Sequence, residues 1–117
     1  SASGCGSVST RFVTGLSPEA RAAADKLPVH EGALDEGTYR GIGEVRGLSC
    51  QINAKSAYRA SKEGALSELR RAAVRDGGNA VMNVRCVHLE QGQSQSNCFE
   101  AFECVGTAVM LDGSAAN

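Results

Sequence analysis

The fold is decided by the stretch Gly77-Gly78-Asn79-Ala80-Val81-Met82-Asn83-Val84-Arg85-Cys86 and by Cys98-Phe99-Glu100-Ala101-Phe102-Glu103-Cys104, which follows a polar connection. Residues 80–89 and 99–111 are predicted to be two antiparallel strands, because pairing them in a single register gives one almost entirely apolar face. We expect the polar residues between them, 89–97, to form a solvated loop that Cys98 tethers. This loop is also the predicted surface for partner binding.

A single register for the two strands predicts one apolar face, with Ala80 opposite Met110, Met82 opposite Ala108, Val84 opposite Gly106, Cys86 opposite Cys104 and His88 opposite Phe102. The other face is mixed and pairs Val81 with Val109, Asn83 with Thr107, Arg85 with Val105 and Val87 with Glu103. The apolar face is expected to form the core of the domain.

The same register limits the disulfides. Four of the cysteines, Cys50, Cys86, Cys98 and Cys104, can pair in three ways. A bond from Cys98 to Cys104 would span roughly 20 Å of extended chain, whereas a disulfide needs Cα atoms closer than about 7 Å. Directly opposed strand residues lie about 5 Å apart, so Cys86 pairs with Cys104. By exclusion, Cys50 pairs with Cys98.

The flanking sequence predicts the remaining elements. Ser17-Pro18-Glu19 is typical of a helix start, and this helix ends before Pro28, where Val29 and His30 become extended. Residues 38–48 read as a bulged strand with frequent glycines, and residues 49–60 as a polar connection. A second helix follows to about residue 75, ends before Gly77, and has apolar positions three and four apart: Ala65, Leu66, Leu69, Ala72 and Ala73.

The predicted fold class is α+β. It is a small two-layer domain, an antiparallel sheet of three to four strands with one main helix packed on one face, stapled by two disulfides. Residues 1–16 form a flexible N-terminal tail, residues 17–112 the domain, and residues 113–117 a frayed C-terminus.

The composition favours a small disulfide-linked domain and disfavours several other classes of protein. The 117 residues contain three Phe, two Tyr and no Trp, which predicts a modest core that gains from covalent links. Five cysteines without a Cys-x-x-Cys pair favour an oxidising compartment over a zinc ribbon or a thioredoxin-like site. A net charge of −1 without a basic stripe disfavours nucleic-acid binding.

The sequence offers no pattern for catalysis, and we expect neither enzyme activity, a metal site nor a cofactor. His30 and His88, the two histidines, lack the spacing of a metal site, and His88 is expected to pack at a strand end. Glu100 and Glu103 point to opposite faces of their strand and therefore cannot act as a carboxylate pair.

The tail contains Ala2-Ser3-Gly4-Cys5, which resembles the end of a bacterial lipobox, the site at which a cysteine is acylated after signal-peptide cleavage. Cys5 is also the odd cysteine, which makes it the candidate lipid attachment site. Gly6 resembles the pattern of outer-membrane sorting. The alternative is that Cys5 is an accidental free thiol in a disordered tail.

Three segments together resemble a known family: Gly43-Glu44-Val45-Arg46-Gly47-Leu48-Ser49-Cys50, Gly78-Asn79-Ala80-Val81, and the spaced Cys86, Cys98 and Cys104 followed by Val105-Gly106-Thr107-Ala108. Over residues 39–111 the chain resembles the RcsF family, outer-membrane lipoproteins that sense envelope stress for the Rcs phosphorelay. The spacing of the four cysteines is the most specific part. The second segment is also similar to small domains once labelled heavy-metal-binding.

The resemblance implies two non-consecutive disulfides, Cys50 with Cys98 and Cys86 with Cys104, and no catalysis. It further implies a palmitate-bearing anchor in the outer membrane, a domain in the periplasm, and protein partners: outer-membrane barrel proteins and an inner-membrane signalling regulator. One departure is the tail after Cys5, which is short and lacks the family's proline-rich linker. The expected function is therefore envelope-stress sensing through protein interaction. The alternatives are a periplasmic ligand or heavy-metal binding module and, last, a thiol oxidoreductase.

Overall fold

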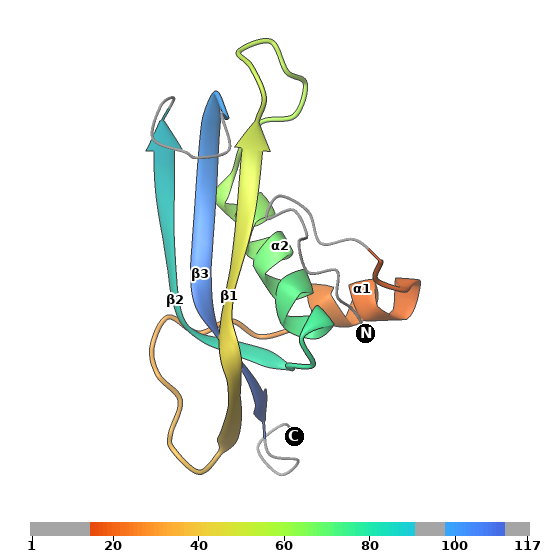
Figure 1. Cartoon of the computed structure of the whole chain (residues 1–117), viewed down its shortest axis with the longest axis vertical. Coiled ribbons are helices and arrows are strands. Elements are labelled where there is room, and N and C mark those ends of the chain that lie inside the picture. The colour runs from red at the N-terminus through yellow and green to blue at the C-terminus, as the bar shows by residue number, and fades with distance from the viewer. Residues whose placement is uncertain (1–14, 91–97, 112–117) are drawn as a thin grey trace.

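The computed structural model describes residues 15–90 and 98–111. It contains two helices and three strands in the order α1 (Pro18–Asp25), β1 (Tyr39–Gln51), α2 (Lys62–Arg75), β2 (Ala80–Glu90) and β3 (Glu100–Leu111). The strands form one antiparallel sheet in the order β1-β3-β2. Helix α2 packs on one face of this sheet and α1 packs against α2 (Figure 1). The predicted two-layer α+β class is confirmed.

Local sequence signals set the bounds of both helices. The hydroxyl of Ser17 accepts a hydrogen bond from the amide of Ala20 at 3.1 Å, and Ser61 accepts one from Gly64 at 2.9 Å. Each serine thus satisfies an amide that the first helical turn leaves unpaired. After α2, Gly77 adopts a φ of +93°, the left-handed conformation that glycine accepts most readily. The predicted start at Ser17 and the predicted stop at Gly77 are confirmed, whereas the cap at Ser61 was not singled out from the sequence.

The core lies between α2 and the sheet and is built mainly from small side chains. Its fully or nearly buried members are Leu27, Val45, Ala65, Leu69, Ala72, Ala73, Val81, Val84, Cys104 and Ala108. At Gly47 the helix lies so close that an added Cβ would overlap the carbonyl oxygen of Ala65 and the amide nitrogen of Leu69. Alanines on the helix and a glycine on the strand therefore allow the backbones to meet.

The predicted register of β2 and β3 is half right. Arg85 lies opposite Val105, Cys86 opposite Cys104, Val87 opposite Glu103 and His88 opposite Phe102, as expected. Before Arg85 the register shifts by one, so Ala80 pairs with Val109, Val81 with Ala108 and Met82 with Thr107, and the predicted pairings of this part are wrong.

The cause of this shift is a β-bulge in which Asn83 and Val84 together oppose Gly106. Asn83 takes a φ of 56°, a left-handed conformation that asparagine tolerates better than most residues. Because a shift of one residue exchanges the two faces, Val81 points toward α2, whereas Ala80 and Met82 point to the other face. Gly106 suits this place, since an added Cβ would meet the side chains of Val81 and Val84.

β1 is longer than expected. It carries the predicted irregularity, between Gly41 and Gly43, but continues through Ser49 and Cys50 to Gln51, which the sequence placed in a connection. Tertiary contacts extend it: Cys50 pairs with Ala101 in the sheet, and the hydroxyl of Ser49 accepts a hydrogen bond from the amide of Ser61 at 3.0 Å. Such contacts outweigh the polar local sequence.

A short extended segment, Val29 and its neighbours, covers part of the free edge of β2. The amide of His30 donates to the carbonyl of Val81 at 2.9 Å, and the amide of Val84 donates to the carbonyl of His30 at 3.1 Å. Val29 forms a parallel bridge with Val81. The extended piece predicted at this place is confirmed, and it protects the bulged half of β2.

Candidate functional site

The four domain cysteines form two disulfides, Cys50–Cys98 and Cys86–Cys104, with Cα atoms 5.5 Å and 4.0 Å apart. The predicted connectivity is confirmed. Cys86–Cys104 lies on the helix side of the sheet, where Cys104 is completely buried in the core. Cys50–Cys98 lies on the opposite side, which we call the outer face.

Small apolar clusters occupy the two ends of the outer face. At one end the Cys50–Cys98 disulfide packs with Leu48, Leu89 and Ala101. At the other, Leu34 and Tyr39 pack against Ala80, Met82, Val109 and Leu111. The second cluster exists because the bulge turned Ala80 and Met82 away from α2. Between the clusters, the middle of the outer face is not covered by any other described element.

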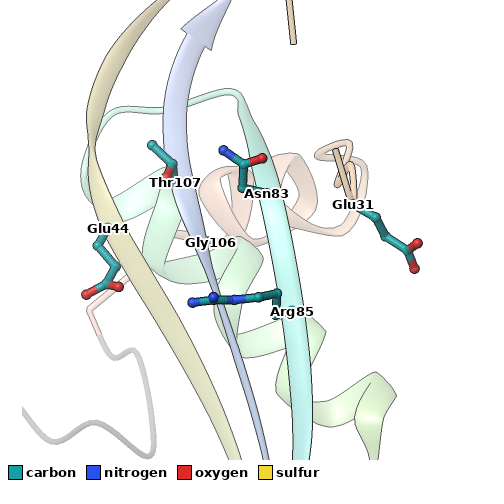
Figure 2. A pocket seen from close by; sticks show the side chains of 6 residues that line it. All are labelled: Glu31, Glu44, Asn83, Arg85, Gly106 and Thr107. Carbon is teal, nitrogen blue, oxygen red and sulfur yellow. The ribbon is translucent and has the colours of Figure 1, made fainter. Parts of the chain in front are cut away.

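This open middle contains a depression of about 370 Å³, which we call the saddle; it is lined by Glu31, Glu44, Asn83, Arg85, Gly106 and Thr107. Figure 2 shows the side chain of Arg85 extending across β3 toward the strand that carries Glu44, while the Glu31 side chain points away. Asn83 and Thr107 flank it on the same face (Figure 2). The saddle therefore presents the guanidinium group of Arg85 with neutral hydrogen-bonding groups beside it, and the carboxylates of Glu31 and Glu44 complete its lining.

Charged pairs border the saddle on its other side. Arg46 lies 3.3 Å from Glu103 and 3.6 Å from Glu44, measured between nitrogen and carboxylate oxygen. All three side chains are partly or largely solvent-accessible, so these pairs contribute little to stability. In the described ranges no carboxylate lies within 4.0 Å of the Arg85 guanidinium, which leaves this group available to a partner.

Asn83, which lines the saddle and has a left-handed backbone conformation, provides a test of the bulge. We expect Asn83→Val to lower the free energy of unfolding by about 1–2 kcal/mol, because a β-branched residue resists the left-handed conformation. Asn83→Gly should stay within about 0.5 kcal/mol of the natural protein. Urea denaturation of the three proteins measures the difference. Equal midpoints for the valine and glycine variants would show that Asn83 does not hold this conformation in solution.

The other polar residues singled out by the sequence do not line the saddle. His88 stacks on Phe102 with ring centroids 4.6 Å apart, and its Nε2 atom lies 2.7 Å from the carboxylate of Glu100. Glu103 contacts Arg46 on the opposite face, so the two glutamates do point in opposite directions. His30 belongs to the segment along β2. The described part of the chain holds no group of three or more His, Cys, Asp or Glu side chains placed to bind a metal ion.

The predicted frayed C-terminus, 113–117, and most of the predicted tail, 1–16, fall outside the described residues, and so do two predicted functional features. They are Cys5, the candidate lipid attachment site, and most of the loop 89–97 predicted to bind a partner, of which only Leu89 and Glu90 are described and belong to β2. Neither helix in the described ranges is long and apolar enough to cross a membrane.

No protein-family model matches this sequence, and no curated protein matches it either. Among solved structures, the fold is similar to that of a DUF74-family protein of unknown function from Pediococcus pentosaceus. The TM-score is 0.52 at 14% sequence identity, and the match covers 72% of this chain and 96% of the other. At this identity the likeness concerns the fold alone.

Proposed function

We propose that this chain is the periplasmic domain of a lipid-anchored outer-membrane protein that senses envelope stress through protein–protein interaction. Its partners would be outer-membrane barrel proteins and an inner-membrane signalling regulator, and its output the Rcs phosphorelay. Acyl chains on Cys5 would hold it at the membrane. In this role the protein binds and releases partners and catalyses no reaction.

The observation that carries this proposal is the pair of non-consecutive disulfides, Cys50–Cys98 and Cys86–Cys104, in a small domain. Two structural disulfides favour an oxidising compartment, of which the periplasm is one. The same connectivity is implied by the resemblance to the envelope sensors. The open outer face, with Arg85 free of ion pairs within the described ranges and Val87 half-exposed, supports a role in protein binding.

The membrane anchor is tested by expressing the precursor, with a signal peptide, in cells supplied with radiolabelled palmitate. We expect label on the natural protein and none on Cys5→Ser, because the thiol is the acceptor of the acyl chain. Membrane fractionation should then place the natural protein with the outer membrane. An unlabelled natural protein in the soluble periplasmic fraction would contradict the anchor.

The signalling role is tested in the same cells with a reporter of the envelope-stress response. Removing the gene should abolish induction by outer-membrane damage, and the natural protein should restore it. Arg85→Glu, which reverses the charge at the centre of the saddle, should reduce induction, whereas Arg75→Glu at the end of α2 should not. A reporter that responds equally with and without the gene would contradict the proposal.

A further inference from the structure

The sheet leaves one long edge open. β1 is one of the two edge strands, and within the described ranges its backbone hydrogen bonds are made with β3 and the residues next to it. Near the end of β1, a groove of about 330 Å³ separates Leu48 and Cys50 from Glu68 and Arg71 on α2. Figure 1 shows β1 at the border of the sheet, opposite β2. An open edge presents unpaired amides and carbonyls to another strand.

The residues with outward-pointing backbone groups can be identified. The carbonyl of Gln51 accepts a hydrogen bond from the amide of Phe99 at 2.7 Å, so the backbone groups of Gln51 point toward β3. Successive residues of a strand alternate in this respect. In the regular part of β1, the amides and carbonyls of Glu44, Arg46, Leu48 and Cys50 therefore point to the open edge.

The sequence at this edge is complementary to itself. Gly43-Glu44-Val45-Arg46-Gly47 has glycines at both ends and opposite charges on either side of a central valine. An antiparallel pairing of two copies about Val45 places Glu44 opposite Arg46 and Arg46 opposite Glu44. These are also the residues whose backbone groups point outward, so the same register matches hydrogen bonds and charges.

We propose that β1 pairs with β1 of a second copy of this chain, antiparallel and about Val45, so that Glu44 faces the partner's Arg46. The pairing joins two three-stranded sheets into one sheet of six strands, with a two-fold axis that passes between the two Val45 residues. It does not depend on lipid attachment or on the proposed signalling role.

A second copy is favoured as occupant because the edge is isologous: one patch supplies both halves of each charge pair, which is the property of a two-fold interface. The glycines at positions 43 and 47 keep bulky side chains away from the contact. The interface is small, because only a few residues pair regularly beyond the irregularity at Gly41 and Gly43. We therefore expect a weak, reversible dimer that forms in the high micromolar range, about 10⁻⁴ M.

Sedimentation equilibrium of the full chain measures this dimer from roughly 10 μM to 1 mM. Cys5→Ser is included in every protein, so that a disulfide between tails cannot mimic the association. Glu44→Arg should raise the dissociation constant by about tenfold or more, because it places two cations opposite each other twice. The double variant Glu44→Arg/Arg46→Glu restores opposite charges and should recover dimerisation to within about threefold of the parent.

Glu36→Arg is the matched control, since it makes the same charge change at an exposed turn outside β1 and should leave the dissociation constant unchanged. Hydrogen exchange gives a second measurement on the chain without charge changes. The amides of Glu44 and Arg46 should become protected as concentration rises, and the amide of Val45 should not change. A monomer at the highest concentration, an unaltered constant for Glu44→Arg, or no recovery in the double variant would each refute the pairing.

Discussion

Cys104→Ser should lower the free energy of unfolding by about 3 kcal/mol or more. Opening the Cys86–Cys104 disulfide, which closes a loop with a sequence separation of 18, releases about 3 kcal/mol of chain entropy in the unfolded state. The variant also buries a hydroxyl group in the apolar core, because Cys104 is fully inaccessible to solvent. This loss is a large part of the about 5–15 kcal/mol that stabilises a typical domain.

Urea denaturation of the Cys5→Ser protein, with and without Cys104→Ser, measures the effect, and the midpoint should fall by about 2 M or more. Cys98→Ser should also be strongly destabilising, because the Cys50–Cys98 loop is longer and worth about 4 kcal/mol in isolation. Induction of the envelope-stress reporter should fall with both variants. Midpoints equal to that of the parent would show that the disulfides are dispensable.

Gly47→Ala should lower the free energy of unfolding by about 3 kcal/mol or more. The new methyl group would overlap backbone atoms of Ala65 and Leu69, and backbone atoms in the middle of α2 cannot move aside as a flexible side chain can. The helix must therefore shift away from β1, which loosens the core that includes Val45 and Leu69.

Gly41→Ala is the control, because the same strand offers open space at that position. Its midpoint in urea should stay within about 0.5 M of the parent. Circular dichroism at low urea distinguishes a shifted helix, which keeps its signal, from loss of the fold. A Gly47→Ala protein as stable as Gly41→Ala would contradict the close approach of α2 to β1.

Local sequence determined much of the fold. Ser17 and Gly77 act through their own backbone neighbours, so these two helix ends could be predicted. The disulfides could be predicted once two strands were expected to pair with Cys86 opposite Cys104, because this pairing leaves Cys50 to bond with Cys98. These features depend on contacts within a few residues or on a single distance limit.

The bulge, the length of β1 and the saddle depended on contacts between distant segments. Nothing in the sequence around Asn83 says that two residues oppose Gly106, because this depends on how Val81 and Val84 pack under α2. Because the predicted register was wrong by one residue before Arg85, Ala80 and Met82 were assigned to the helix side of the sheet, whereas they lie on the outer face. The saddle could not be predicted because it joins Glu31, Glu44 and Arg85 from three separate segments. The one signal in the sequence was the alternation of side chains along a strand, which correctly placed Arg85 on the mixed face.

The Cys50–Cys98 disulfide also determines how the domain carries tension. When force is applied to the two ends of the chain, the shortest covalent path between them crosses the disulfide from Cys50 to Cys98. These two residues are 48 positions apart in the sequence. Helix α2 and strand β2 lie between these residues and so are bypassed. Pulling can unravel α1 and peel the exposed half of β1 from β3, but the segment from α2 to β2 stays slack while the bond is intact.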